Sequence, residues 1–126
     1  MSVIVLHLMP RDAWERLVPG EPITNASLET EGFIHCTDDH DVLLQVANAF
    51  YRDVPGEFVV LRVAAADLTS ACVWEAPAHI NGSGESFAES FPHVYGPIDR
   101  NAVVGVEAVR RDAGRTFVGY SPEPSA

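Results

Sequence analysis

The stretch Glu31-Gly32-Phe33-Ile34-His35-Cys36-Thr37 decides how the rest of the chain has to be arranged. A glycine is followed by two large apolar residues, and then by a histidine and a threonine two positions apart. Alternate residues of a β-strand point to the same face. We therefore expect His35 and Thr37 on one face, and Ile34 and Cys36 on the other. An apolar strand that presents an imidazole and a hydroxyl on one face is typical of the wall of a functional site.

A second stretch, Phe91-Pro92-His93-Val94-Tyr95-Gly96-Pro97, repeats this pattern. His93 and Tyr95 also lie two positions apart and are expected on one face. A third histidine, His7, comes near the end of an apolar segment at the start of the chain. The site hypothesis requires His7, His35 and His93 to converge on one cavity.

Length and composition favour one globular domain. The chain has 126 residues and 47 % hydrophobic residues, which suits a single core. We expect one domain over residues 1–120 and a disordered tail over residues 121–126, which are rich in Ser and Pro. Cys36 and Cys72 are expected to be free thiols, because no export signal is apparent and we expect a cytoplasmic protein.

The charge of the chain limits the classes of partner. The formal net charge is −10, and all eight basic residues are arginine. An acidic surface repels phosphate backbones, so non-specific nucleic-acid binding is not expected. No apolar run approaches the roughly 20 residues of a membrane helix. The acidic charge leaves room for a small anionic ligand held by one or two local arginines, and the sequence does not set the oligomeric state.

The pattern of apolar residues predicts an α+β fold with two main helices. One helix begins at Pro10-Arg11-Asp12 and ends before Pro19-Gly20, and the other begins at Asp38-Asp39-His40-Asp41 and ends before Pro55-Gly56. Apolar segments predict strands at residues 3–9, 32–36, 57–64, 71–75, 102–109 and 115–120. Residues 20–30 are predicted as a loop, and residues 76–90 as a mobile loop that could lie over the site.

Other kinds of site fit the sequence less well. No HxH, CxxC or HExxH motif is present, so no metal site is expected. Cys36 is expected to pack in the core, away from His35. Gly82-Ser83-Gly84 lacks the strand-to-helix context of a hydrolase elbow. Glu75 and Glu89 suit either an acid–base role or a solvated surface, and each single histidine also suits a structural role.

Taken together, the motifs resemble those of the family known as domain of unknown function 952. The resemblance covers about residues 3–110 and rests on His7, Trp14, Gly32 to Thr37, Trp74-Glu75 and Phe91 to Pro97. It implies a split, bent, mostly antiparallel sheet similar to that of ADP-ribosyltransferases, on the branch with the RNA 2′-phosphotransferases. It also implies a nucleotide-like ligand and NAD as cofactor.

The resemblance implies roles for five residues. His35, Thr37 and His93 would be catalytic, and His7 and Tyr95 would bind the cofactor. Such enzymes break the bond between nicotinamide and ribose through an oxocarbenium-like centre. A phosphate group would need an arginine, for which Arg11, Arg62 and Arg100 are the candidates. The alternative is a non-catalytic module that binds a small ligand in the same cleft.

Overall fold

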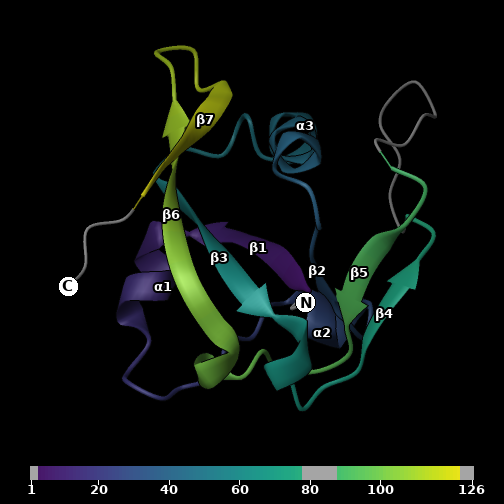
Figure 1. The fold of residues 1–126 in the computed structure, drawn as a ribbon. Helices are drawn as coiled ribbons and strands as arrows, with labels where there is room; N and C mark the ends of the chain where they lie inside the picture. Colours follow the sequence, from purple (N-terminus) through teal and green to yellow (C-terminus); the bar gives the residue numbers. More distant parts are fainter. Residues whose placement is uncertain (1–2, 78–87, 123–126) are drawn as a thin grey trace.

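Two antiparallel sheets and three helices make up the computed structural model, which describes residues 3–77 and 88–122 (Figure 1). The larger sheet has the strand order β1-β3-β6-β7 and the smaller has the order β2-β5-β4. The strands are β1 (Ile4–Pro10), β2 (Ile34–His35), β3 (Phe58–Ala64), β4 (Cys72–Glu75), β5 (Phe91–Val94), β6 (Val103–Arg111) and β7 (Phe117–Pro122). The helices are α1 (Arg11–Arg16), α2 (Ser27–Thr30) and α3 (His40–Phe50), with 3₁₀ turns η1 (Ala65–Asp67) and η2 (Arg100–Ala102).

Strand β3 is the centre of the larger sheet. It pairs with β1 on one side and β6 on the other, and all of its residues except Arg62 are buried. A strand buried on both faces needs the nearly continuous apolar run that this segment carries. Val59, Leu61 and Val63 point to one face, and Phe58 and Val60 point to the other. The two faces of this strand therefore belong to two separate hydrophobic clusters.

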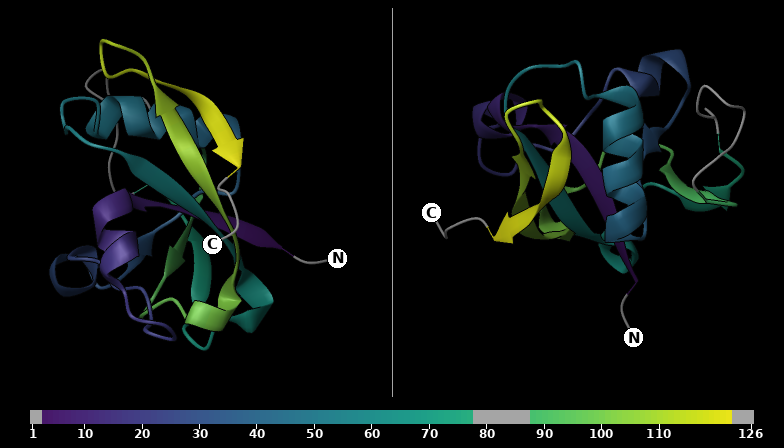
Figure 2. Two further views of the ribbon diagram at one scale, coloured as in Figure 1. Left: turned by 90° about the vertical axis from the view of Figure 1, so that its left-hand side faces the viewer. Right: turned by 90° about the horizontal axis from the view of Figure 1, so that it is seen from above.

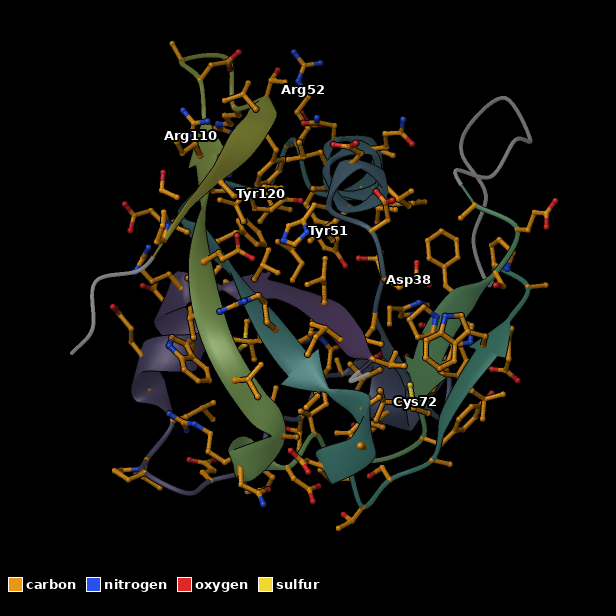
Figure 3. All side chains as sticks on the ribbon, viewed as in Figure 1. Asp38, Tyr51, Arg52, Cys72, Arg110 and Tyr120 are labelled. Carbon is orange, nitrogen blue, oxygen red and sulfur yellow. The ribbon has the colours of Figure 1, made fainter. Side chains whose placement is uncertain are left out.

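Different elements cover the two faces. Helix α3 packs beside β1 and β7 on the face of Val60, with Leu43 and Ala47 buried (Figure 2). Tyr120 of β7 lies beside this helix (Figure 3), and its hydroxyl donates a hydrogen bond to the carbonyl of His40 at 2.7 Å. The smaller sheet supplies Ile34 and Val94 to the core on the opposite face. The larger sheet is thus the middle layer of the fold.

The stretch around Thr37 joins the two sheets. The backbone N–H of Leu6 donates to the carbonyl of Thr37 at 2.6 Å, and the N–H of Thr37 donates to the carbonyl of Leu6 at 2.9 Å. On its other side, Ile34–His35 pairs with β5, with His35 opposite His93. The segment that the sequence singled out therefore has β1 of the larger sheet on one side and β5 of the smaller sheet on the other.

The observed elements confirm the predicted α+β class and the antiparallel arrangement. Both predicted helices are present as α1 and α3. Residues 20–30 are not entirely a loop, because they contain α2. Just before this helix, the side-chain oxygen of Asn25 accepts a hydrogen bond from the N–H of Ser27 at 2.9 Å. The predicted strand 32–36 is shorter, since Gly32 has a φ of +91°, which an extended strand does not use.

The remaining differences concern the ends of segments. β7 continues to Pro122, so residues 121 and 122 of the expected tail pair with β6, whereas residues 123–126 lie outside the described residues. Most of the predicted mobile loop, residues 78–87, also lies outside them. No helix within the described segments is long and apolar enough to cross a membrane.

Candidate functional site

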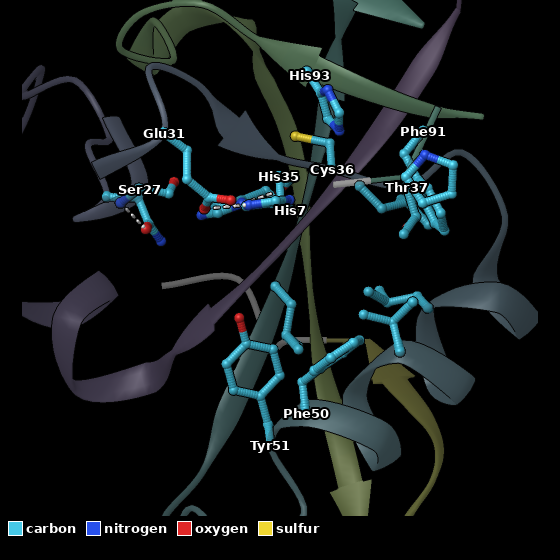
Figure 4. Close-up of a pocket in the computed structure, with 16 residues that line it drawn as sticks. His7, Ser27, Glu31, His35, Cys36, Thr37, Phe50, Tyr51, Phe91 and His93 are labelled. Atoms are coloured by element: carbon cyan, nitrogen blue, oxygen red, sulfur yellow. Dashed lines mark hydrogen bonds and ion pairs between the residues drawn. The ribbon is translucent and has the colours of Figure 1, made fainter. Parts of the chain in front are cut away.

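A pocket of about 380 Å³ lies where β1, the segment 31–37 and α3 meet (Figure 4). Its size is within the range of about 300–1,000 Å³ that small-molecule sites usually have. Apolar side chains from α3 and its C-terminal end form one wall, and polar side chains from β1 and β2 form another. The lining residues are Leu6, His7, Leu8, Asn25, Ser27, Glu31, His35, Cys36, Thr37, Leu43, Val46, Phe50, Tyr51, Pro77, Phe91 and His93.

His7 is a neutral imidazole whose Nε2 is a hydrogen-bond acceptor. Its Nδ1 lies 3.0 Å from the backbone carbonyl oxygen of His35. A carbonyl oxygen only accepts, so Nδ1 carries the hydrogen and Nε2 carries the lone pair. The side chain is only 3 % exposed, and this burial lowers its pKa below the ordinary histidine value. Within the described residues, Nε2 has no hydrogen-bond partner.

Two buried hydroxyl groups of the pocket also have no hydrogen-bond partner among the described residues. Thr37 is 4 % exposed and Ser27 is 8 % exposed, and both residues line the pocket. Neither Thr37 Oγ1 nor Ser27 Oγ has a hydrogen-bond partner in the described part of the chain. A buried polar group without a partner costs about 1–3 kcal/mol, so three of them around one pocket are unusual. A polar ligand bound in the pocket would give these three polar atoms hydrogen-bond partners.

His35 and Glu31 bring a carboxylate to the pocket. Nε2 of His35 donates to Oε2 of Glu31 at 2.8 Å, and both residues line the cavity (Figure 4). The ring of Phe33 contacts the ring of His35 edge-on, with 4.9 Å between the centroids. Tyr51 lies across the pocket from this pair, and burial raises the pKa of its phenol, with Glu31 adding to the effect. Tyr51 is therefore a neutral hydroxyl at neutral pH.

His93 is the third histidine of the pocket. Its Nδ1 donates to Oε1 of Glu75 at 2.7 Å, and its ring stacks on Phe33 with 4.0 Å between the centroids. The hydroxyl of Tyr95 donates to the same oxygen of Glu75. The hydrogen bond from Tyr95, and to a smaller extent the one from His93, lower the pKa of Glu75. The hydrogen bond between Tyr95 and Glu75 also raises the pKa of Tyr95. Glu75 is thus an ionised partner of His93.

Four of the five site residues expected from the sequence line the same pocket. His7, His35, Thr37 and His93 meet there, so the three histidines converge as the site hypothesis requires. Tyr95 does not line it. Tyr95 is 42 % exposed and contacts Glu75 and Phe33.

Cys36 belongs to the hydrophobic core, as expected, although it also reaches the wall of the pocket. Burial raises the pKa of its thiol strongly, so it is a neutral group and not a nucleophile. No group of three or more His, Cys or carboxylate side chains suited to a metal ion occurs among residues 3–77 and 88–122. His79 and Ser83 lie outside the described residues.

The arginine candidates are placed elsewhere. Arg11 pairs with Glu57 at 2.9 Å, and the guanidinium of Arg100 lies 4.2 Å from the ring centroid of Trp14. Arg62 lies beside Gly105 on the larger sheet, where the side chain covers the space that a Cβ would need. No arginine is among the described residues that line the pocket, so its charged group is the carboxylate of Glu31.

Several pocket residues were not predicted from the sequence. The sequence predicts a loop at Ser27 and a helix that includes Phe50 and Tyr51, and neither pattern indicates a pocket. Glu31 had a usable signal, because it lies four residues before His35 and the intervening Gly32 turns the backbone. Glu75 was a candidate, but nothing local to the sequence pairs it with His93.

Comparison with known proteins places this fold and these motifs in a family. Residues 8–106 match the family model described as "Protein of unknown function (DUF952)". The crystal structure of protein CC0527 from Caulobacter crescentus superposes with a TM-score of 0.68 at 22 % identity, covering 91 % of this chain and 93 % of that one. Its solution NMR structure gives a TM-score of 0.62 at 23 % identity, covering 88 % of each chain.

At these identities the likeness to CC0527 shows a shared fold. None of the curated proteins matches the chain. The family model covers most of the chain, including two of the three pocket histidines, His35 and His93, and the two stretches 31–37 and 91–97. His7 is the exception, because it lies one residue before the matched range. The chain belongs to the DUF952 family of proteins of unknown function.

Proposed function

We propose that the protein binds a small organic molecule, neutral or positively charged, in the pocket between β1, the segment 31–37 and α3. The observation that carries the proposal is the set of three buried polar atoms, His7 Nε2, Thr37 Oγ1 and Ser27 Oγ, without partners in the described residues. Native proteins rarely leave such atoms unsatisfied. A bound molecule with complementary polar groups supplies the missing hydrogen bonds.

The chemistry of the pocket limits the class of ligand that fits it. His7 Nε2 only accepts, so the ligand presents an O–H or N–H group to it. The two hydroxyls accept or donate, and the apolar wall with Phe50 and Phe91 suits a ring. Glu31 favours a positive charge and repels a phosphate, and no arginine of the described segments lines the pocket to offset this repulsion. A nucleoside-like molecule without a phosphate in the buried part fits these conditions.

An NAD-using transferase is the second candidate function. The observation that favours it is the carboxylate of Glu31 in the pocket, because the nicotinamide ring of NAD and an oxocarbenium-like centre both carry positive charge. The ribose hydroxyls suit His7 and Thr37, and the diphosphate of NAD would then lie outside the pocket. The ADP-ribosyltransferase-like fold implied by the resemblance stays a prediction.

Thermal unfolding with a panel of probes tests both candidates. We expect nicotinamide riboside and adenosine, at millimolar concentration, to raise the Tm of the protein more than ADP-ribose does, since ligands stabilise the state that they bind. A larger shift with ADP-ribose, or no shift with any nucleoside, would contradict the proposed ligand class. Nicotinamide released from NAD by the wild type, and lost in His35→Ala, would identify the transferase.

Thr37→Val separates a ligand-binding hydroxyl from a structural one. The variant keeps the shape of the side chain and removes a buried hydroxyl without a described partner. We expect the unfolding free energy of the ligand-free protein to stay equal or rise by up to about 1 kcal/mol, while affinity for the stabilising nucleoside falls about tenfold. Equilibrium urea unfolding and calorimetric titration measure the two quantities.

Thr69→Val is the matched control, because the Thr69 hydroxyl donates to Asp99 at 2.9 Å and neither residue lines the pocket. It should not change the affinity. A loss of stability in Thr37→Val with unchanged affinity would assign the Thr37 hydroxyl to the fold.

A further inference from the structure

We propose that the pocket is a site of proton transfer, in which His93 Nε2 accepts a proton from an O–H or N–H group of the bound molecule and Glu75 and Tyr95 position His93. The inference rests on the proposed binding of a small polar molecule in this pocket. It adds a chemical step to that binding and assigns Glu75 and Tyr95, which do not line the cavity, a part in it.

The hydrogen-bond pattern orients the ring of His93. Glu75 is ionised, so it only accepts, and the hydrogen of His93 is held on Nδ1 at 2.7 Å from Oε1. The lone pair is then on Nε2. Glu75 is not among the residues that line the cavity, whereas His93 is, so the Nδ1 edge of the ring faces away from the cavity and the Nε2 edge faces it. Figure 4 shows the His93 ring directed from its strand toward the other pocket residues.

Packing fixes this orientation. Phe33 stacks on the imidazole with an interplanar angle of 18°, and the residue is only 2 % exposed. Tyr95 holds Glu75 from the other side through a hydrogen bond to the same oxygen. His93 has no further hydrogen-bond partner among the described residues. A base whose position is set before the ligand arrives does not have to be ordered during the reaction.

The proton balance of the step is simple. The O–H or N–H bond of the bound molecule breaks, its electron pair stays on the oxygen or nitrogen, and the hydrogen forms an N–H bond at His93 Nε2. The imidazolium that results is stabilised by the carboxylate of Glu75 on its other nitrogen. Neither an oxidant nor a metal takes part in this transfer.

His7 is less suited than His93 to accept the proton. Burial lowers its pKa, and its Nδ1 faces a neutral backbone carbonyl and not a carboxylate, so a positive charge on His7 has no ionised partner there. His35 already holds Glu31 through its Nε2. Among the pocket histidines, His93 is the one whose carboxylate partner lies outside the pocket and whose second nitrogen faces it.

Diethyl pyrocarbonate, a reagent that acylates the unprotonated nitrogen of histidine, tests the inference without knowledge of the natural ligand. Native protein is treated briefly at neutral pH, and the modified peptides are quantified by mass spectrometry. His40 is the internal reference, because it is exposed, does not line the pocket, and has its Nε2 2.8 Å from Glu107. We expect His93 to react despite its burial, at a rate comparable to that of His40.

Two positioning variants give the diagnostic result. In Glu75→Gln the charged hydrogen bond to Nδ1 is lost, so we expect modification of His93 to slow about tenfold while His40 is unchanged. Tyr95→Phe, at an exposed position, should slow the modification of His93 less, by about threefold, because the hydrogen bond between Glu75 and His93 remains. Nitrogen-15 NMR of the imidazoles should show Nδ1 protonated in wild-type His93 and both tautomers in Glu75→Gln.

Two outcomes would overturn the inference: a native His93 that does not react while His40 does, or a rate at His93 that Glu75→Gln leaves unchanged. Failure of the binding proposal is distinguishable from both, because the nucleoside probes would then leave the Tm unchanged while His93 kept its reactivity and its tautomer.

Discussion

At the scale of single residues, the three pocket histidines are alike in sequence context but differ in their partners. His7 donates to a backbone carbonyl, His35 to Glu31 and His93 to Glu75. The partner decides what each ring can do, because a carboxylate stabilises an imidazolium and a carbonyl in a buried site does not. His7 is therefore suited to hydrogen-bond recognition and His93 to proton transfer.

The burial of His7 makes the stability of the protein depend on pH. Its folded-state pKa lies below the ordinary value of about 6.5, so on acidification the unfolded chain takes up the proton first. Stability is fully present above that value and is lost as the pH falls toward the folded-state pKa. Between about pH 7.5 and about pH 5.5 this histidine should remove up to about 1.4 kcal/mol from the unfolding free energy.

The measurement is urea unfolding of the wild type and of His7→Asn at the two pH values. Asparagine keeps a donor for the carbonyl of His35 but does not titrate. The wild type should lose more stability than the variant on acidification. Equal losses would mean that His7 takes up its proton as readily in the folded protein as in the unfolded chain.

At the scale of elements, α3 both covers the larger sheet and forms the apolar wall of the pocket. Leu43 and Ala47 are buried against the sheet, while Val46 and Phe50 of the same helix line the pocket. Because one helix contributes to both, its stability and the shape of the pocket are coupled.

Asp39 is the N-cap of α3, and its carboxylate accepts from the N–H groups of Asp41 at 2.8 Å and Val42 at 3.0 Å. Asp39→Ala should lower the unfolding free energy by about 1 kcal/mol, because two helix donors lose their partner. Asp41→Ala removes the same charge from the same turn without removing the cap, and should cost less. Denaturant titration compares the two, and equal costs would show that only charge near the helix end matters.

Arg111 anchors the segment that follows α3 to the larger sheet. Its guanidinium lies 4.2 Å from the ring centroid of Phe117, and its donors contact backbone carbonyls of Arg52, Val54, Gly56 and Arg115 at 2.8, 2.7, 2.9 and 3.0 Å. Lysine cannot reproduce this planar set of donors.

Arg111→Lys should therefore lower the unfolding free energy by about 2 kcal/mol or more, as several carbonyls lose a charged donor. Arg110→Lys, at the preceding and exposed residue of the same strand, is the control and should cost under about 0.5 kcal/mol. Thermal and urea unfolding of both variants give the comparison. A small loss for Arg111→Lys would mean that water replaces the lost donors.

At the scale of the whole molecule, the net charge of −10 acts on every element at once. Repulsion between like charges destabilises a compact acidic chain, and salt weakens this repulsion. Raising NaCl from about 0.01 M to about 0.15 M shortens the Debye length from about 30 Å to about 8 Å, so the Tm should rise by a few degrees. Sucrose of equal osmolarity, which does not screen charge, is the control. A fall in Tm would show that exposed ion pairs such as Arg11–Glu57 outweigh the repulsion.

The sequence by itself determined the local features of this protein. The apolar run 58–64, the capped helix after Asp39 and the alternation from Ile34 to Thr37 each follow from residues close together in the chain. Periodicity and capping are local properties, so they can be read without knowing the partners of a segment. For this reason the α+β class and four of the pocket residues could be predicted.

Only the tertiary structure decided which side chains share the pocket and how each is held. His7 meets the carbonyl of His35 because Leu6 pairs with Thr37, and His93 lies opposite His35 because β5 pairs with β2. Glu75 reaches His93 because β4 pairs with β5, and none of the candidate arginines is among the described residues that line the pocket. Strand register between distant segments depends on the packing of the whole core, which no local pattern encodes.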